Sequence, residues 1–311
     1  MNKLIYAAAL PAMALAAAPA QADHHQQAEH AHHAQMDHVD HAQHADHDKM
    51  AHAEHMAAAY AKKHGEAISG AVNHPTRKDD KARDPYRHPD KMLAFFQIAP
   101  DMKVGEYAPG GGWLSRLLGH YVGGEGKLVG LFFTPTSGPF DAAAQSRIRA
   151  AAAKFPADVA GFTGLPADHF TGYTLDGVPE GEKGTFDRII IGRMMHNMLR
   201  WNMADAEIKA MRDLLKDDGM IGIEQHRAKA DAPWSYANGS KGYLRQQDVI
   251  DFMRLNGFEL VGASEMNANP KDSADHPEGV WEMPPVLRTQ REDLKGLGES
   301  DRMTLLFKKA S

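Results

Sequence analysis

Apolar runs and amphipathic stretches alternate along most of the chain. The run "GKLVGLFF" (residues 126–133) is nearly continuous, which is typical of a parallel strand covered on both faces, and a second buried strand is expected at 186–191. Apolar positions three and four residues apart, such as Trp113, Leu114 and Leu117, indicate helices. The alternation predicts one α/β domain, doubly wound around a mostly parallel sheet.

The same pattern places further elements between residues 89 and 309. Helices are expected to begin at Pro89 and at Trp113, to cover 141–154, and to form the first parts of 205–226 and 245–265. Strands are expected to end at Glu106 and at Ile223, to form the last part of 245–265, and to cover 301–309. Residues 266–300 lie between the last two strands and are polar and rich in proline. Their Trp281, Met283 and Leu287 favour a packed lid.

The first residues have the pattern of a secretory signal peptide. Lys3 precedes an apolar run of about 15 residues, and Ala20-Gln21-Ala22 has the small-x-small form that signal peptidase cleaves. The run is shorter than the roughly 20 residues of a membrane-spanning helix. We therefore expect a signal peptide at 1–22 and a periplasmic or secreted mature chain without a membrane anchor. The absence of cysteine suits an oxidising compartment.

Residues 23–76 form a low-complexity stretch in which histidine dominates, with 12 of the 19 histidines between 24 and 64. Its few large apolar side chains predict a disordered arm, partly helical at most, ahead of a domain at 77–311. His38, His41, His44 and His47 recur every third residue, and neutral imidazole binds zinc, copper or nickel. The arm is therefore either a weak metal-capturing segment or a solubilising tail.

The net charge of −6 gives no indication of a basic surface for nucleic acid. A small-molecule substrate is the expected partner, and the cleft for it is predicted from the stretch "VGEYAPGGGWLSRLL" (104–118). This stretch is a strand, a glycine turn and a helix. Ser115 replaces the third glycine of the dinucleotide pattern, and the lysine of a phosphate-binding Walker loop is missing.

The stretch also contains an acidic strand end followed by a glycine turn, in the pattern E-x-x-P-G-G-G. This pattern is compatible with S-adenosylmethionine, because glycine lets the backbone approach a ligand closely. The predicted cofactor contacts are Glu106, Pro109, Gly110, Gly111, Gly112 and Trp113. The helix that begins near Trp113 would direct its free N–H groups at the carboxylate of the cofactor. The alternative is a structural turn that binds nothing.

The motif "RMMHNMLRW" (193–201) follows a buried strand and so belongs at the carboxyl edge of the sheet, where α/β proteins bind ligands. Arg193, His196 and Asn197 are predicted to hold an acceptor or to take its proton, and His226 ends the next strand on the same edge. Arg87 and Arg302 would either clamp an anion or fix loops through salt bridges.

Long blocks of the chain, among them "RDPYRHPDKMLAFFQIAPDMKVGEYAPGGGW" (83–113), "GIEQHRA" (222–228) and "ESDRMTLLFKK" (299–309), resemble a family of bacterial proteins described as predicted class I S-adenosylmethionine-dependent methyltransferases, many with signal peptides. The resemblance covers about 83–309. It implies a seven-stranded sheet with an antiparallel last strand, and methyl transfer to a small acceptor. The alternative is an exported, non-catalytic ligand- or metal-binding protein on the same fold.

Overall fold

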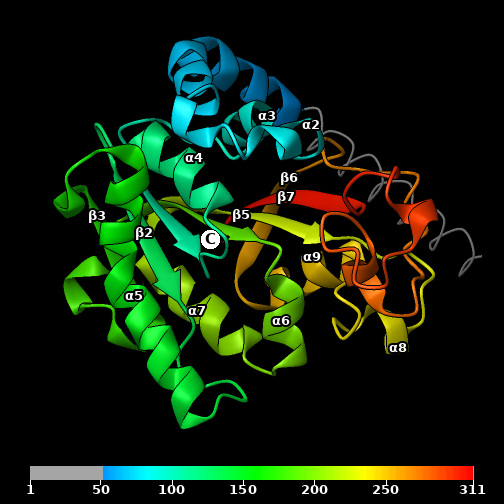
Figure 1. Cartoon of the computed structure of the whole chain (residues 1–311). Coiled ribbons are helices and arrows are strands. Elements are labelled where there is room, and N and C mark those ends of the chain that lie inside the picture. Colours follow the sequence, from blue (N-terminus) through cyan, green and yellow to red (C-terminus); the bar gives the residue numbers. More distant parts are fainter. Residues whose placement is uncertain (1–51, 311) are drawn as a thin grey trace, which may run out of the picture. The chain divides into compact units, whose positions relative to one another are not determined.

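The computed structural model describes residues 52–310, and these form a domain around a seven-stranded sheet (Figure 1). The strands are β1 (Lys103–Tyr107), β2 (Lys127–Phe132), β3 (Phe170–Thr174), β4 (Phe186–Gly192), β5 (Leu215–His226), β6 (Phe258–Ser264) and β7 (Arg302–Lys309). Their order is β3-β2-β1-β4-β5-β7-β6, and only β7 runs antiparallel to its neighbours. The predicted doubly wound, mostly parallel sheet is confirmed.

Helices cover both faces of the sheet (Figure 1). They are α2 (Asp84–Arg87), α3 (Pro89–Phe95), α4 (Trp113–Val122), α5 (Ala142–Thr163), α6 (Met195–Arg200), α7 (Ala204–Leu214), α8 (Trp234–Ala237) and α9 (Gln246–Leu255). A further helix covers 52–72. The helix at 52–72, α3, α4 and α5 share one apolar core with the sheet, whereas α6, α7 and α9 share the other.

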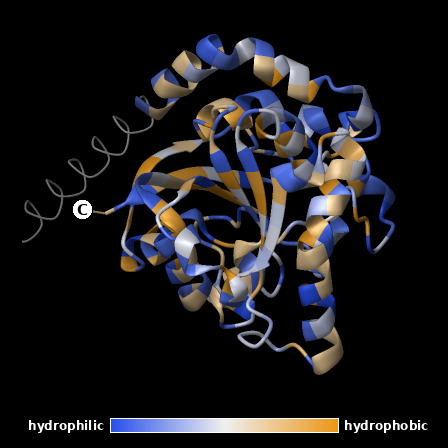
Figure 2. Cartoon of the chain, turned by 90° about the vertical axis from the view of Figure 1, so that its left-hand side faces the viewer, coloured by the Kyte–Doolittle hydropathy of each residue, from blue (hydrophilic) through white to orange (hydrophobic). Residues whose placement is uncertain are grey.

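The two cores follow from the alternation of side chains along each strand. In β4, Ile189 and Ile191 belong to the core beneath α7, and Ile190 belongs to the core beneath α3 and α4. All three are buried, as expected for a central strand with helices on both sides. Figure 2 shows apolar residues along the central strands and on the helices around them.

Two elements differ from the predicted pattern. The hydrophobic pattern did not reveal β3, because only its end residues Phe170 and Thr174 are buried and it lacks an apolar run. Helix α5 continues beyond the predicted end at 154, through Pro156, to Thr163. Phe155 and Val159 are buried against the sheet, and this packing outweighs the hydrogen bond that proline removes.

The helix at 52–72 lies within the stretch predicted as a low-complexity arm, but its Ala53, Ile68 and Ala71 are buried in the core shared with α3. This part of the stretch therefore contributes to the domain. The predicted signal peptide and the predicted metal ligands His38, His41, His44 and His47 lie outside the described residues. Among residues 52–310, no helix is long and apolar enough to cross a bilayer.

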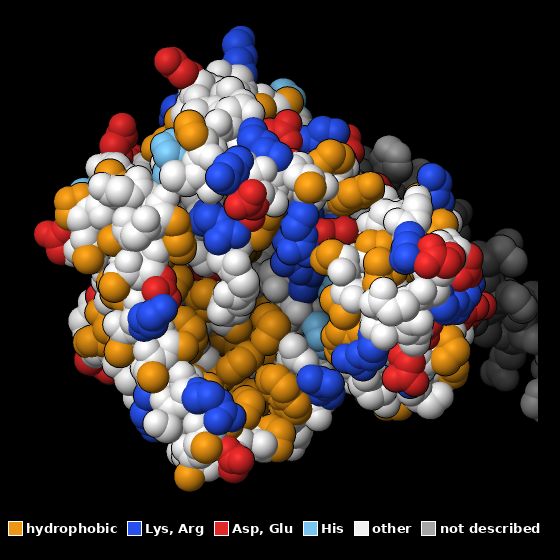
Figure 3. All heavy atoms as spheres, viewed as in Figure 1, with side chains coloured by type: hydrophobic (Ala, Val, Ile, Leu, Met, Phe, Trp, Pro, Cys, Tyr) orange, Lys and Arg blue, Asp and Glu red, His pale blue; other side chains and the backbone are white. Residues whose placement is uncertain are grey.

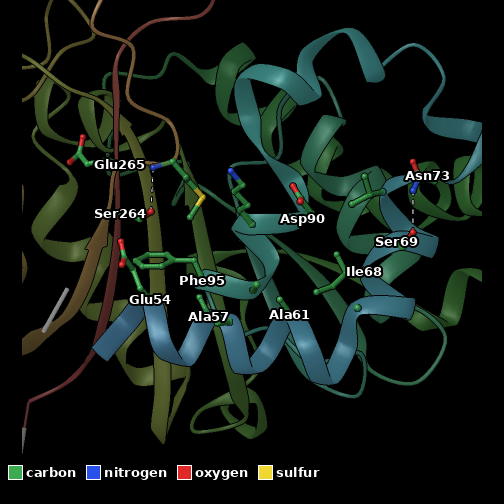
Figure 4. Close-up of a pocket in the computed structure, with 16 residues that line it drawn as sticks. Glu54, Ala57, Ala61, Ile68, Ser69, Asn73, Asp90, Phe95, Ser264 and Glu265 are labelled. Atoms are coloured by element: carbon green, nitrogen blue, oxygen red, sulfur yellow. Dashed lines mark hydrogen bonds between the residues drawn. The ribbon is translucent and has the colours of Figure 1, made fainter. Parts of the chain in front are cut away.

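A hollow of about 740 Å³ lies between the helix at 52–72, α3 and the end of β6 (Figure 4). Small residues of the helix, including Ala57, Ala61 and Gly65, leave this space beside Phe95. No residue of β1 or β4 lines this hollow. Ligands of doubly wound sheets bind at the carboxyl ends of the central strands, and that edge is therefore the candidate site.

Candidate active site

The glycine turn joins the central strand β1 to α4. Glu106 pairs in register with Gly130 of β2 and Ile190 of β4, so the turn begins in the middle of the sheet edge. Gly112 has φ +82°, and a Cβ there would lie 2.7 Å from Nη1 of Arg116. Ala108, directly after β1, has φ +51°. A non-glycine residue in this region is uncommon and is characteristic of functional sites.

A cavity of about 220 Å³ lies at this turn. The predicted cofactor residues Glu106, Gly110, Gly111, Gly112 and Trp113 all line it, whereas Pro109 belongs to the same turn but is not part of the lining. The cavity also receives Arg83, Arg87, Arg193 and Glu224 from other elements. The sequence-predicted turn therefore has charged neighbours that its own motif does not include.

Four residues that line this cavity carry a buried polar atom without a hydrogen-bond partner among the described residues: Glu106 (Oε2), Arg87 (Nη1), Trp113 (Nε1) and Glu224 (Oε1, which is in an ion pair with Arg302). Glu106 and Arg87 are each 3% exposed. Burial raises the pKa of Glu106 to about 7, although Ser115 and Arg193 oppose the shift. Burial and then Arg193 lower the pKa of Arg87 to about 9, so the guanidinium remains charged at neutral pH. An unsatisfied carboxylate oxygen and an unsatisfied cation complement the amine and the carboxylate of an α-amino acid.

Glu106 and Arg87 thus fit the methionyl end of S-adenosylmethionine. Beyond the turn, Phe133 at the end of β2 lies with its ring centroid 5.8 Å from Phe140 and 5.5 Å from Trp201. Figure 3 shows that this face of the molecule is hollowed at its centre, with apolar side chains on the floor. An aromatic surface beside the glycine turn suits a flat heteroaromatic ring.

The sequence shows no acid at the end of β2, but the structure places one there from another element. Glu207 of α7, 1% exposed, accepts hydrogen bonds from Tyr107 Oη (2.7 Å) and from the Thr134 backbone N–H (3.1 Å). Both carboxylate oxygens are thus engaged within the protein. Glu207 fixes the ends of β1 and β2 relative to each other.

A second cavity, of about 250 Å³, contains all four predicted catalytic residues: Arg193, His196, Asn197 and His226. Arg83, Arg87 and Arg193 line both cavities, so the two are adjacent. Residues of the segment 266–300 form the opposite wall: Val280, Trp281, Pro284, Pro285 and Val286. Met283 of that segment is fully buried and Trp281 and Leu287 are half-buried, so the segment packs against the domain, and its action as a lid stays a prediction.

Strand register explains why distant residues meet here. Gly192 of β4 pairs with Glu224 of β5, and His226 of β5 pairs with Arg302 of β7. Arg193 follows at φ +57°, and its backbone N–H donates to the Glu224 carbonyl at 2.6 Å. A non-glycine residue in this conformation stores about 1 to 3 kcal/mol of strain, which the surrounding structure must offset.

The tautomer of His196 follows from its neighbour. Gln225 donates through Nε2 to the Gly242 carbonyl (2.8 Å), and its Oε1 lies 3.2 Å from Nδ1 of His196. An amide oxygen only accepts, so Nδ1 carries the proton and Nε2 retains its lone pair. Burial lowers the pKa of His196 to about 4 against the opposing bond from Gln225, and Arg200 and Arg193 add to the lowering. His196 is a neutral base at pH 7.

His226 is a second neutral imidazole in the same cavity. Its Nδ1 lies 2.6 Å from Oγ of Ser300, and its ring centroid lies 5.7 Å from that of His196. Burial, followed by His196 and Arg193, holds its pKa well below the usual range. Among residues 52–310, no group of three histidine or acidic side chains is arranged to hold a metal ion.

Two buried glutamates tie the arginines of both cavities together. Glu299 pairs with Arg83 (2.9 Å), Arg87 (2.9 Å) and Arg302. Burial alone would raise the pKa of Glu299, but Arg302 and Arg87 outweigh it and the pKa falls to about 2. Glu224 pairs with Arg193 (3.0 Å) and Arg302 (2.8 Å), and its pKa is lowered for the same reason.

The sequence reasoning did not select Arg83 or Glu299. A signal for Glu299 was present, because an antiparallel last strand begins at the carboxyl edge of the other strands, and Glu299 lies shortly before the first residue of that strand, Arg302. Arg83 offers no comparable signal. Its role is visible only through the ion pair with a residue more than two hundred positions away.

No family model and no curated protein matches the chain. Similar solved structures include an S-adenosylmethionine-dependent methyltransferase from Aquifex aeolicus (13% identity, 76% of this chain and 99% of that one, TM-score 0.43). Others are the Burkholderia thailandensis 1,6-didemethyltoxoflavin-N1-methyltransferase with bound S-adenosylhomocysteine (10%, 86% and 91%, 0.41) and the [4+2]-cyclase SpnF (16%, 72% and 80%, 0.44). At these identities the likeness concerns the fold alone.

Proposed function

We propose that the protein transfers a methyl group from S-adenosylmethionine to a small acceptor. The observation that supports this most directly is the presence, among the buried and unpartnered atoms of the first cavity, of Oε2 of Glu106 and Nη1 of Arg87. They complement the amine and carboxylate of the methionyl group. The adjoining cavity, with the neutral base His196, would receive the acceptor.

The residues have separate roles in this proposal. Glu106 accepts from the amine, and Arg87 donates to the carboxylate. Gly110 and Gly111 line the cavity and let a ligand approach the backbone closely, and a Cβ added at either position would meet no protein atom within 4 Å. Substitutions there would therefore obstruct the ligand rather than the fold.

S-adenosylmethionine supplies a methyl group bonded to a sulfonium sulfur. As the acceptor atom bonds to the methyl carbon, the sulfur–methyl bond breaks and the sulfonium becomes a neutral thioether. His196 takes the proton of the acceptor through Nε2, and Gln225 holds the ring so that this nitrogen remains free. Arg193 and Trp281 position the acceptor in the second cavity, and Arg193 also lines the first.

Isothermal calorimetry of the mature chain with S-adenosylmethionine and S-adenosylhomocysteine tests the proposal. We expect binding in the wild type and at least a tenfold weaker affinity in Gly110→Ala. The matched control is Gly161→Ala, at an exposed position of α5 where an added Cβ also meets nothing within 4 Å. Absence of binding at millimolar ligand would refute methyl transfer. Binding without a methylated product from any acceptor would favour the exported ligand-binding alternative.

We also propose that the protein acts after export and that the histidine arm captures metal weakly. The support is the pattern at residues 1–22 and the spacing of His38, His41, His44 and His47. Replacing these four histidines by glutamine should lower the zinc stoichiometry of the full chain in a calorimetric titration. Equal stoichiometry in the two proteins would contradict capture by these residues.

A further inference from the structure

We infer that the acceptor is a small, amphipathic anion with a hydroxyl or amine group, bound through its acidic group by Arg193 in the second cavity. This inference rests on the proposed function, since it names the class of acceptor for that site. It draws on the charge balance of the two cavities, the free donors of Arg193, and the apolar wall opposite.

The charges do not balance within the protein. Four guanidinium groups, those of Arg83, Arg87, Arg193 and Arg302, share only the two carboxylates of Glu224 and Glu299. A methionyl carboxylate on Arg87 would compensate one of the two surplus charges, while its amine is matched by Glu106. The sulfonium of the bound donor adds a positive charge of its own, so two positive charges face the acceptor before methyl transfer and one remains after it. Surplus charge is costly to the extent that it is removed from water, and Arg87 and Arg302 are almost fully buried, whereas Arg193 is 24% exposed.

Arg193 lines the second cavity together with His196 and Asn197 and can bind the acidic group of the acceptor. The three nitrogens of Arg302 each lie against a protein oxygen, of Glu224, Glu299 or the Tyr86 carbonyl, and the residue is 1% exposed. Arg193 has one side-chain hydrogen bond among the described residues, from Nη1 to Glu224 (3.0 Å), and its side chain is 24% exposed. Its remaining donors are sufficient for a carboxylate or phosphate oxygen.

The other residues that line the cavity indicate the size and the apolar character of the rest of the ligand. Trp281 lies on the wall opposite the arginines with its ring centroid 6.1 Å from that of His196. The guanidinium groups of Arg200 and Arg288 lie 5.7 and 4.9 Å from the Trp281 ring centroid and hold the ring in place. An aromatic or branched aliphatic body would cover this ring, and about 250 Å³ limits it to a small molecule.

The acceptor must also offer a hydrogen-bond donor. Oδ1 of Asn197 is buried without a partner among residues 52–310, and Nε2 of His196 carries a lone pair. Both atoms accept, so a hydroxyl or amine group satisfies them. The acidic group at Arg193 also removes part of the positive potential that weakens His196 as a base, so the binding of the anion and the acceptance of the proton reinforce each other.

Calorimetric titrations of the full chain, with and without S-adenosylhomocysteine, test this inference. The probes are 3-hydroxybenzoate, 3-hydroxyphenyl phosphate, and the neutral methyl ester of 3-hydroxybenzoate; the two anions distinguish a carboxylate site from a phosphate site. We expect at least one anion to bind ten times more tightly than the ester. Arg193→Gln should remove that preference, and Arg193→Lys should retain most of it. Arg254→Gln, on the exposed face of α9, is the matched control and should change nothing.

Equal binding of the anions and the ester, no binding of either anion, or an unchanged preference in Arg193→Gln would overturn the inference. If Arg193→Gln does not fold, the wild type is titrated at high salt in place of the variant. The preference for the anions over the ester should then be lost. Anion binding without any binding of S-adenosylmethionine would leave the anion site standing and refute the proposed methyl donor. Binding of S-adenosylmethionine without anion preference would do the reverse.

Discussion

Replacing Glu106 by Gln should stabilise the protein at alkaline pH and weaken its cofactor site. The carboxyl is 3% exposed, and burial raises its pKa from 4.5 to about 7. A raised pKa in the folded state means that the stability contributed by this group is complete below pH 4.5. That stability is lost as the pH rises through about 7, because the ionised carboxylate must remain buried.

The size of the effect follows from the shift. A difference of about 2.5 pKa units corresponds to about 3 kcal/mol, at roughly 1.4 kcal/mol per unit. Glutamine has a similar shape and no charge to lose, so Glu106→Gln should gain about 3 kcal/mol over the wild type between pH 4 and pH 8. All other ionisable groups are common to both proteins and cancel in the comparison.

Urea unfolding of both proteins at several pH values between 4 and 8.5 measures this difference. Glu259→Gln, at an exposed position of β6, is the matched control for the exchange itself. The reasoning is wrong if the stability curves of the wild type and Glu106→Gln run parallel across this range. In the same variant, binding of S-adenosylmethionine should fall at least tenfold, because its amine loses the carboxylate partner.

Further predictions concern the ion network and the packing of the sheet. Glu299→Gln should destabilise the protein by about 3 kcal/mol or more at pH 7, because three arginines lose their shared carboxylate. The lowered pKa, about 2, means that this difference should shrink in urea unfolding as the pH falls from 4.5 towards 2, and a constant difference would contradict the assignment. Gly172→Ala should cost about 3 kcal/mol or more, because its Cβ would lie 2.0 Å from the Ala152 carbonyl oxygen, whereas Gly161→Ala should gain about 0.5 to 1 kcal/mol from helix propensity. Thermal unfolding separates these two, and equal midpoints would refute the packing argument.

The sequence predicted the features that depend on local pattern. Continuous apolar strands such as 126–133, the glycine turn, and the positions of Arg193, His196 and His226 after strand ends could all be read without contacts, because strand ends of a parallel sheet share one edge. Strand β3 could not be predicted in the same way. It lies at the edge of the sheet and is buried only at its two end residues.

Features that depend on distant partners were not predictable. The helix at 52–72 has mostly small residues and reads as low complexity, and only contact with α3 makes its Ala53 and Ile68 core residues. The shared role of Arg83 and Glu299 likewise exists only once β7 has inserted between β5 and β6. Long-range ion pairs leave no periodic trace in a sequence.

The insertion of β7 has a consequence for how the site could diversify. Because β7 is antiparallel to β6, β6 ends and β7 begins at the same edge of the sheet, and the whole connection between them lies at that edge. The wall that carries Trp281 and Pro284 is thus one continuous peptide whose two ends are fixed by strands. The part of this peptide that carries Trp281 and Pro284 can change in length and composition without altering the glycine turn or the strand order, whereas Glu299 near its end stays tied to Arg87 in the first cavity.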